Sequence, residues 1–134
     1  MKEVRILTID ARGRIVIPQI IRKSIGITTN SQLMMVSDSE TKEIKITPIA
    51  FTEGDKHFKY RITMKDEAGS LAKIAKAFGD NGISLVYGEA VIVEKGKTAI
   101  WTVVGGHGDL GPEELEALLL GDGDALKVEI IPLE

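Results

Sequence analysis

Short stretches in which hydrophobic and polar residues alternate run along the first third of the chain. Such alternation is typical of strands with one buried face. It predicts strands over residues 4–10, 14–17, 31–37 and 42–49, the last two joined into a hairpin by the polar turn DSETK. Ile21 and Ile25 lie four residues apart after Pro18, which favours a short helix that ends at Gly26. This part of the chain is therefore predicted to be four short strands around one short helix.

The remainder has a pattern of longer elements. A strand is predicted over residues 58–65, and Leu71, Ile74 and Phe78 follow at helical spacing within a predicted helix over 68–82. Two strands then meet at the turn EKGK, residues 94–97, before a helix over 111–121 and a strand over 125–133. The order βαββαβ is that of ferredoxin-like folds. We therefore predict an α+β protein with domains at 1–50 and 57–134, divided by a polar joint at 51–57.

Charge divides the chain in the same way. Residues 1–50 carry eight Lys and Arg against five Asp and Glu, a balance of +3, whereas the remainder carries nine against fifteen, a balance of −6. A basic surface suits a polyanionic partner and an acidic one does not. The two predicted domains are therefore expected to have different partners.

Composition argues against several classes of site and protein. The chain has no cysteine and only two histidines, far apart in sequence, which argues against disulfides, thiol catalysis and a metal site. No window reaches the roughly 18 apolar residues of a membrane span, and acidic residues occur where a signal peptide would be apolar. Asp66 and Glu67 have no evident nucleophile or base-orienting partner, so we expect neither an enzyme nor a bound cofactor. The sequence therefore indicates a cytoplasmic protein without catalytic activity.

The first predicted domain is too short to bury a core alone. Domains of this size usually need oligomerisation, and their strand edges are exposed unless a second chain covers them. We therefore expect an obligate dimer, which would double the arginines on one surface.

The segment DARGRIVIPQIIRKSIGI, followed by two short strands that end in KITPI, resembles the swapped-hairpin DNA-binding domain of the AbrB/MazE/SpoVT superfamily over residues 3–49. The resemblance implies that two chains interleave into a small β-barrel whose basic face lies on double-stranded DNA. The family's basic positions match Arg14, Arg22 and Lys23. Leu7 stands where the family has a further arginine, and Arg5 lies on the same strand face. With Arg12 in the turn, the predicted DNA-binding residues are Arg5, Arg12, Arg14, Arg22 and Lys23.

The second predicted domain resembles the ACT domain over residues 57–132. The D-x-P-G-x-L loop of that family occurs as Asp66–Leu71, with Ala68 in place of proline. The resemblance implies a regulatory unit that in many proteins binds an amino acid at the interface of two paired domains. It implies a ligand site formed by Met64, Asp66, Glu67, Ala68, Gly69 and Ser84.

The chemistry of these residue types agrees with both implied sites. Arginines on a rigid turn can bridge phosphates or bind guanine edges, with an affinity that falls steeply with salt. Amides at a helix N-terminus suit a carboxylate, and Asp66 could accept a hydrogen bond from an ammonium group. The simpler alternatives are that the arginines only solvate a turn and a helix face, and that Asp66 or Ser70 only caps the helix.

Together these features predict a transcriptional regulator in which an amino-acid effector alters the assembly of ACT domains as a homodimer or tetramer. Two alternatives stay open. One is a regulatory ACT protein that controls a metabolic enzyme and uses its first domain only to dimerise. The other is an architectural DNA-binding protein whose ACT domain only oligomerises.

Overall fold

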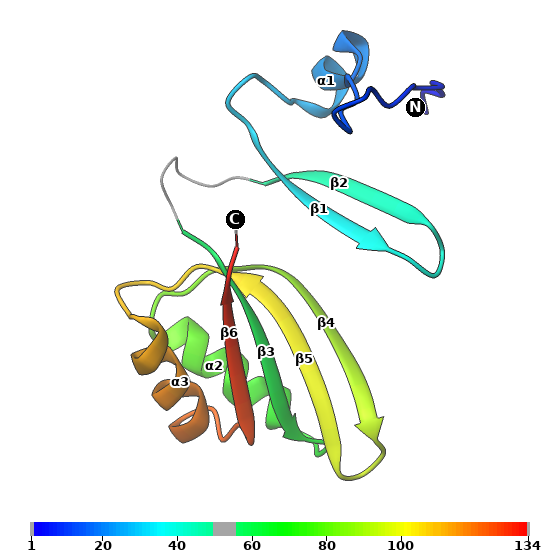
Figure 1. Ribbon diagram of the computed structural model, residues 1–134. Coiled ribbons are helices and arrows are strands. Elements are labelled where there is room, and N and C mark those ends of the chain that lie inside the picture. Colours follow the sequence, from blue (N-terminus) through cyan, green and yellow to red (C-terminus); the bar gives the residue numbers. More distant parts are fainter. Residues whose placement is uncertain (1, 50–55, 134) are drawn as a thin grey trace. The chain divides into compact units, whose positions relative to one another are not determined.

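A computed structural model describes residues 2–49 and 56–133 (Figure 1). The chain divides into two compact units, Met1–Thr52 and Glu53–Glu134, which we call unit 1 and unit 2. Residues 51–55 of the predicted joint lie outside the described residues, as do residues 1, 50 and 134 at the ends of the predicted domains. No helix in the described ranges is long and apolar enough to cross a membrane.

Unit 1 contains one short helix and one hairpin. Helix α1 (Gln19–Ile25) begins after Pro18 and ends at Gly26, whose left-handed φ of 76° lets the N–H of Ile27 donate to the carbonyl of Arg22 at 2.8 Å. Strands β1 (Gln32–Asp38) and β2 (Glu43–Ile49) pair antiparallel. This helix and hairpin lie where the sequence pattern predicts them.

The two strands predicted at residues 4–10 and 14–17 are not formed in the single chain. Within residues 2–17, the backbone hydrogen bonds are the two that close a turn, from Asp10 N–H to the Arg14 carbonyl and from Gly13 N–H to the Asp10 carbonyl, both 3.0 Å. A strand is stable only when a neighbouring strand pairs with its backbone groups. The single chain supplies no such neighbour, and the two-chain barrel stays a prediction.

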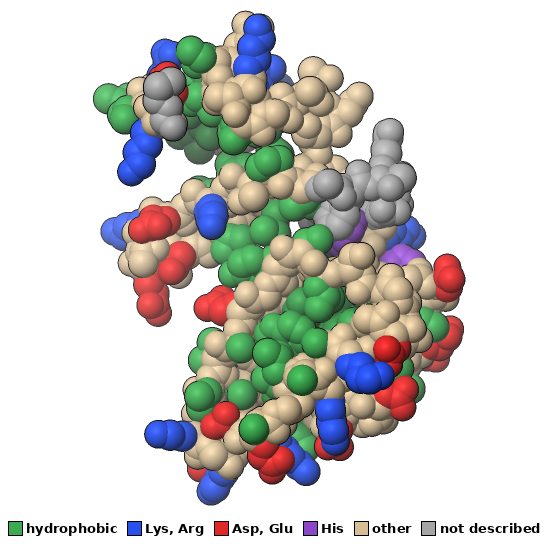
Figure 2. All heavy atoms as spheres, turned by 180° about the vertical axis from the view of Figure 1, so that it is seen from behind, with side chains coloured by type: hydrophobic (Ala, Val, Ile, Leu, Met, Phe, Trp, Pro, Cys, Tyr) green, Lys and Arg blue, Asp and Glu red, His purple; other side chains and the backbone are tan. Residues whose placement is uncertain are grey.

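Unit 1 also has no hydrophobic core of its own. None of the residues from 2 to 49 is buried, and Figure 2 shows hydrophobic side chains at the surface of both units. The large hydrophobic residues exposed in unit 1 are Val4, Ile6, Leu7, Ile9, Ile15, Val16, Ile20, Ile25, Met35 and Ile44. Exposed apolar surface of this extent is typical of segments that bind a partner surface.

Unit 2 is an antiparallel sheet covered on one face by two helices. In chain order its elements are β3 (Phe58–Lys65), α2 (Ser70–Asp80), β4 (Leu85–Glu94), β5 (Thr98–Gly105), α3 (Pro112–Gly121) and β6 (Lys127–Pro132). The strand order across the sheet is β4-β5-β3-β6 (Figure 1). The predicted βαββαβ, ferredoxin-like arrangement of this region is confirmed.

The core of unit 2 lies between the sheet and the helices. Alternate residues of β3 point into it, and the ring centroid of Phe78 on α2 lies 5.0 Å from that of Tyr60 and 6.2 Å from that of Trp101. The Tyr60 hydroxyl donates to the Gly106 carbonyl at 2.6 Å, which satisfies its polar group inside the core.

We expect Tyr60 to ionise only in strong alkali. Burial raises its pKa from 10.0 to about 12. The neutral phenol therefore stabilises the fold fully below pH 10, and this contribution is lost as the pH rises toward 12. A Tyr87→Phe variant leaves Tyr60 as the only tyrosine, so the ultraviolet absorbance of phenolate reports it alone. A midpoint near 10 in the folded protein would contradict the expectation.

Candidate functional site

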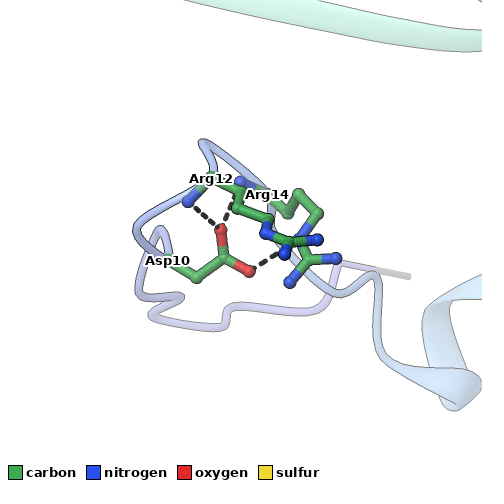
Figure 3. A network of polar contacts seen from close by, with 3 residues as sticks. All are labelled: Asp10, Arg12 and Arg14. Carbon is green, nitrogen blue, oxygen red and sulfur yellow. Dashed lines mark hydrogen bonds and ion pairs between the residues drawn. The ribbon is translucent and has the colours of Figure 1, made fainter.

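The turn between residues 10 and 14 carries two of the predicted DNA-binding arginines. One carboxylate oxygen of Asp10, Oδ1, accepts hydrogen bonds from the backbone N–H groups of Arg12 and Arg14, both at 2.9 Å. The other oxygen, Oδ2, accepts a bond from Arg14 Nε at 2.8 Å (Figure 3). Gly13 allows the turn because its φ is 75°, a conformation that other residues rarely adopt. Asp10 thus holds both the backbone of the turn and one arginine side chain.

These contacts favour the charged form of Asp10. The hydrogen bond from the Arg14 backbone is the main reason that the pKa of Asp10 lies below its ordinary value of 3.8; desolvation opposes this effect, while the Arg14 side chain and the Arg12 backbone add to it. Because the pKa is lowered, the stabilising contribution is present above pH 3.8 and is lost as the pH falls through the lower value. Asp10 is therefore an anion at neutral pH.

The other predicted DNA-binding residues lie apart from this turn in sequence. Arg5 is exposed, with its Nε 3.9 Å from Glu3 Oε2. Arg22 and Lys23 lie in the last turn of α1, where cations interact favourably with the helix dipole. Arg22 Nε is buried and finds no hydrogen-bond acceptor within the described part of the chain. An acceptor from another molecule would remove the cost of that unsatisfied group.

The predicted ligand loop connects β3 to α2 in unit 2. Met64 is buried, whereas Glu67, Ala68 and Gly69 are exposed. Gly69 is the N-cap of α2 with φ 89°, and no side chain of the described residues caps this helix. The alternative that Asp66 or Ser70 caps α2 is therefore wrong.

Asp66 instead joins two loops that lie far apart in sequence. Its Oδ2 accepts a hydrogen bond from the backbone N–H of Gly96 at 2.7 Å, and its own N–H donates to the Lys97 carbonyl at 3.1 Å. Because β3 and β5 are antiparallel, the end of β3 lies beside the turn that precedes β5. The predicted βαββαβ order could have indicated this contact, because it brings the turn at 94–97 and the end of β3 to the same end of the sheet.

Ser84 lies at the opposite end of the sheet from this loop. It precedes Leu85, which is level with Gly105 and Phe58, whereas the loop follows Lys65, which is level with Thr98. Seven residues of extended strand span roughly 23 Å. One copy of unit 2 therefore does not bring Ser84 to Asp66, and these residues could share a ligand only across a pair of copies.

The match with known families falls on unit 2. Residues 61–116 match the family model of the ACT domain. This region is an ACT domain. Such a domain implies a regulatory role that depends on sensing a small molecule. The match does not extend to unit 1, whose resemblance to a DNA-binding family remains a prediction.

One solved structure similar to this chain is the solution structure of the C-terminal domain of the MgtC protein from Mycobacterium tuberculosis. It is 21% identical in sequence, with a TM-score of 0.48, over 63% of this chain and 95% of that domain. No curated protein matches the sequence. Among the described residues, no group of three or more His, Cys, Asp or Glu side chains is arranged to hold a metal ion.

We expect Asp66→Ala to destabilise the ACT domain even without ligand. The substitution removes the acceptor of the Gly96 N–H, at a cost of about 1 kcal/mol in the free energy of unfolding. Urea unfolding followed by the fluorescence of Trp101 measures this change. Glu67→Ala is the matched control, because Glu67 is an exposed neighbour whose side chain makes no hydrogen bond or ion pair with described residues. Equal effects of both substitutions would contradict a structural role for Asp66.

Proposed function

We propose that this chain is a DNA-binding transcriptional regulator and not an enzyme. In this proposal two or four copies assemble, unit 1 binds double-stranded DNA, and the ACT domain binds an amino acid that alters assembly or DNA affinity. The observation that carries the proposal is the combination found in unit 1. A turn held by Asp10 presents two arginines on a segment that has no buried residue of its own.

The absence of buried residues in the described part of unit 1 supports a second copy as its partner. Val4 and Ile6 are 87% and 98% exposed in the single chain, and they lie on one face of a predicted strand. Pairing with the same segment of a second copy would cover these residues and satisfy the unpaired backbone. A symmetric dimer of this kind would carry two Asp10–Arg14 turns.

The charges of unit 1 support DNA as the ligand. Within the described residues, the side chains of Arg12 and Lys23 take part in no ion pair, and Arg14 engages Asp10 through Nε alone. Cations without protein partners are free to neutralise phosphates and release counterions. The acidic balance of the remainder of the chain makes the ACT domain an unsuitable surface for DNA.

The ACT domain supports an effector site between copies. The loop that follows β3 and the residue that precedes β4 lie at opposite ends of one sheet. Two copies related by a two-fold axis perpendicular to the strands would bring the loop of one beside Ser84 of the other. A ligand bound there would favour the paired arrangement, and through it one spacing of the two basic surfaces on DNA.

The test is the binding of the full chain to a labelled duplex taken from upstream of its own gene, followed by anisotropy over a series of salt concentrations. We expect tight binding that weakens steeply with salt. Arg14→Ala should lower the affinity at least about tenfold, because a dimer loses two arginines from its DNA-binding surface. Lys45→Ala, a cation on β2 outside the predicted set, is the matched control and should change binding little.

The other outcomes distinguish the alternatives. Absence of binding at low salt, where phosphate contacts are strongest, would overturn the proposal and favour a regulator of a metabolic enzyme. Binding that no amino acid alters, in a screen with the same assay, would favour an architectural role.

A further inference from the structure

We propose that Asp10 is a positioning residue that directs Arg14 toward the edges of bases, so that Arg14 determines sequence preference rather than only contacting phosphates. This inference rests on the proposed DNA binding and goes beyond it, because it assigns different tasks to the two arginines of one turn. The two arginines differ in which atoms of the guanidinium group are already engaged.

Asp10 engages one side of the Arg14 guanidinium and leaves the other free. The Nε–H of Arg14 donates to Asp10 Oδ2 at 2.8 Å, so the contact restrains the direction of the group (Figure 3). A guanidinium offers a bidentate pair of donors either from Nε and one terminal nitrogen or from its two terminal nitrogens. With Nε engaged, the pair left for a ligand is the two terminal nitrogens. Two donors in a plane match the two acceptors that guanine presents in the major groove.

The backbone of the turn is fixed by the same carboxylate. Oδ1 of Asp10 accepts from the N–H groups of Arg12 and Arg14, so the base of the Arg14 side chain and its tip are tied to one residue. A flexible arginine loses up to about 2 kcal/mol of rotamer entropy when it is immobilised on a ligand. An arginine that is already held loses less, and it also cannot turn toward an incorrect acceptor.

Arg12 lacks this support and provides an internal comparison. Its backbone N–H donates to Asp10, but its side chain makes no hydrogen bond or ion pair with any described residue. Arg12 is therefore suited to a mobile phosphate contact, which contributes affinity without sequence preference.

The charge of Asp10 supplies a sharp test of this assignment. A carboxylate beside DNA repels phosphates, so its presence lowers affinity for any sequence. Asp10→Asn removes the charge and keeps an oxygen for the two backbone N–H groups, but it replaces the acceptor of Arg14 Nε. If Asp10 positions Arg14, this variant should bind mixed-sequence DNA more tightly and yet discriminate less between sequences. A residue that only maintained the fold would weaken binding to both.

The experiment measures affinities of the full chain for two duplexes. One is selected from a random-sequence pool by the wild-type protein, and the other is a mixed-sequence duplex of equal length. We expect Asp10→Asn to lower the ratio of the two affinities about tenfold, the range that one bidentate base contact provides. Arg14→Ala should lower the same ratio, whereas Arg12→Ala should weaken both duplexes alike.

Asp38→Asn is the matched control. Asp38 also accepts hydrogen bonds from two backbone N–H groups in a turn of unit 1, those of Glu40 at 2.9 Å and Thr41 at 3.3 Å, but it contacts no arginine. The variant removes the same charge and should leave the ratio of affinities unchanged. If Asp38→Asn lowers the ratio of affinities as much as Asp10→Asn does, the proposal is overturned, because loss of one negative charge would then explain the loss of discrimination.

A second measurement separates this inference from DNA binding itself. The Nε–H resonance of Arg14 in the free protein should be resolved and protected from exchange in the wild type, and lost in Asp10→Asn. If the wild type binds no duplex but its Arg14 Nε–H resonance still differs from that of Asp10→Asn, the proposed function is refuted and the contact between Asp10 and Arg14 is confirmed. A wild type that binds DNA without enriching any sequence, or an Asp10→Asn variant that discriminates as well as the wild type, would overturn the positioning role.

Discussion

Ile6→Glu is expected to halve the mass of the assembly in solution, although Ile6 is 98% exposed in the single chain. In an isolated monomer, such a surface substitution would be nearly neutral. In the proposed assembly the Ile6 side chain is covered by a second copy, and a charge placed there loses its water without gaining a partner. Two such sites in a two-fold interface should cost at least about 4 kcal/mol, which corresponds to about a thousandfold in the dissociation constant.

The mass of the full chain should therefore be measured by sedimentation over a range of concentrations. A wild-type dimer would become a monomer, and a tetramer held also by the ACT domains would become a dimer. Thr41→Glu is the matched control, because it adds the same charge at an exposed turn of the β hairpin in unit 1. An assembly that Ile6→Glu leaves unchanged would show that unit 1 associates through another surface or not at all.

Assembly through unit 1 would also explain why the strands predicted at residues 4–10 and 14–17 are not formed in the single chain. Alternation at residues 4–10 predicts a strand with one covered face, but alternation does not say which chain supplies the cover. In unit 2 the covering residues belong to the same chain. The pattern of Tyr60, Ile62 and Met64 is therefore matched by buried residues on α2 and α3, and the predicted βαββαβ order is confirmed.

Individual side-chain contacts were harder to predict than elements. The sequence places Asp10 four residues before Arg14, yet the bond to Arg14 Nε depends on a positive φ at Gly13 and on one side-chain conformation. Asp66 illustrates the same limit. A carboxylate before a helix favours a cap, but here Oδ2 of Asp66 accepts a hydrogen bond of 2.7 Å from the backbone N–H of Gly96 in a neighbouring turn.

Phe78→Ala is expected to remove a large share of the stability of the ACT domain. The Phe78 side chain is 1% exposed and packs edge-to-face with the rings of Tyr60 and Trp101, so its removal leaves a cavity that these large rings cannot readily fill. Such a substitution typically costs about 3–5 kcal/mol, against a total of about 5–15 kcal/mol for a small domain. At about 4 °C or more per kcal/mol, the melting temperature should fall by at least about 12 °C.

The chain offers a probe that isolates this effect, because Trp101 is its only tryptophan and belongs to the ACT domain. Leu120→Ala is the matched control: Leu120 is also a large apolar residue on a helix of unit 2, but it is 39% exposed and should cost less than about 1 kcal/mol. The described residues of the core around Phe78 all belong to unit 2, so the interface tested by Ile6→Glu should survive while the effector response is lost. Loss of both together would mean that the two units fold as one, and that the ACT domain supports the DNA-binding unit directly rather than through assembly.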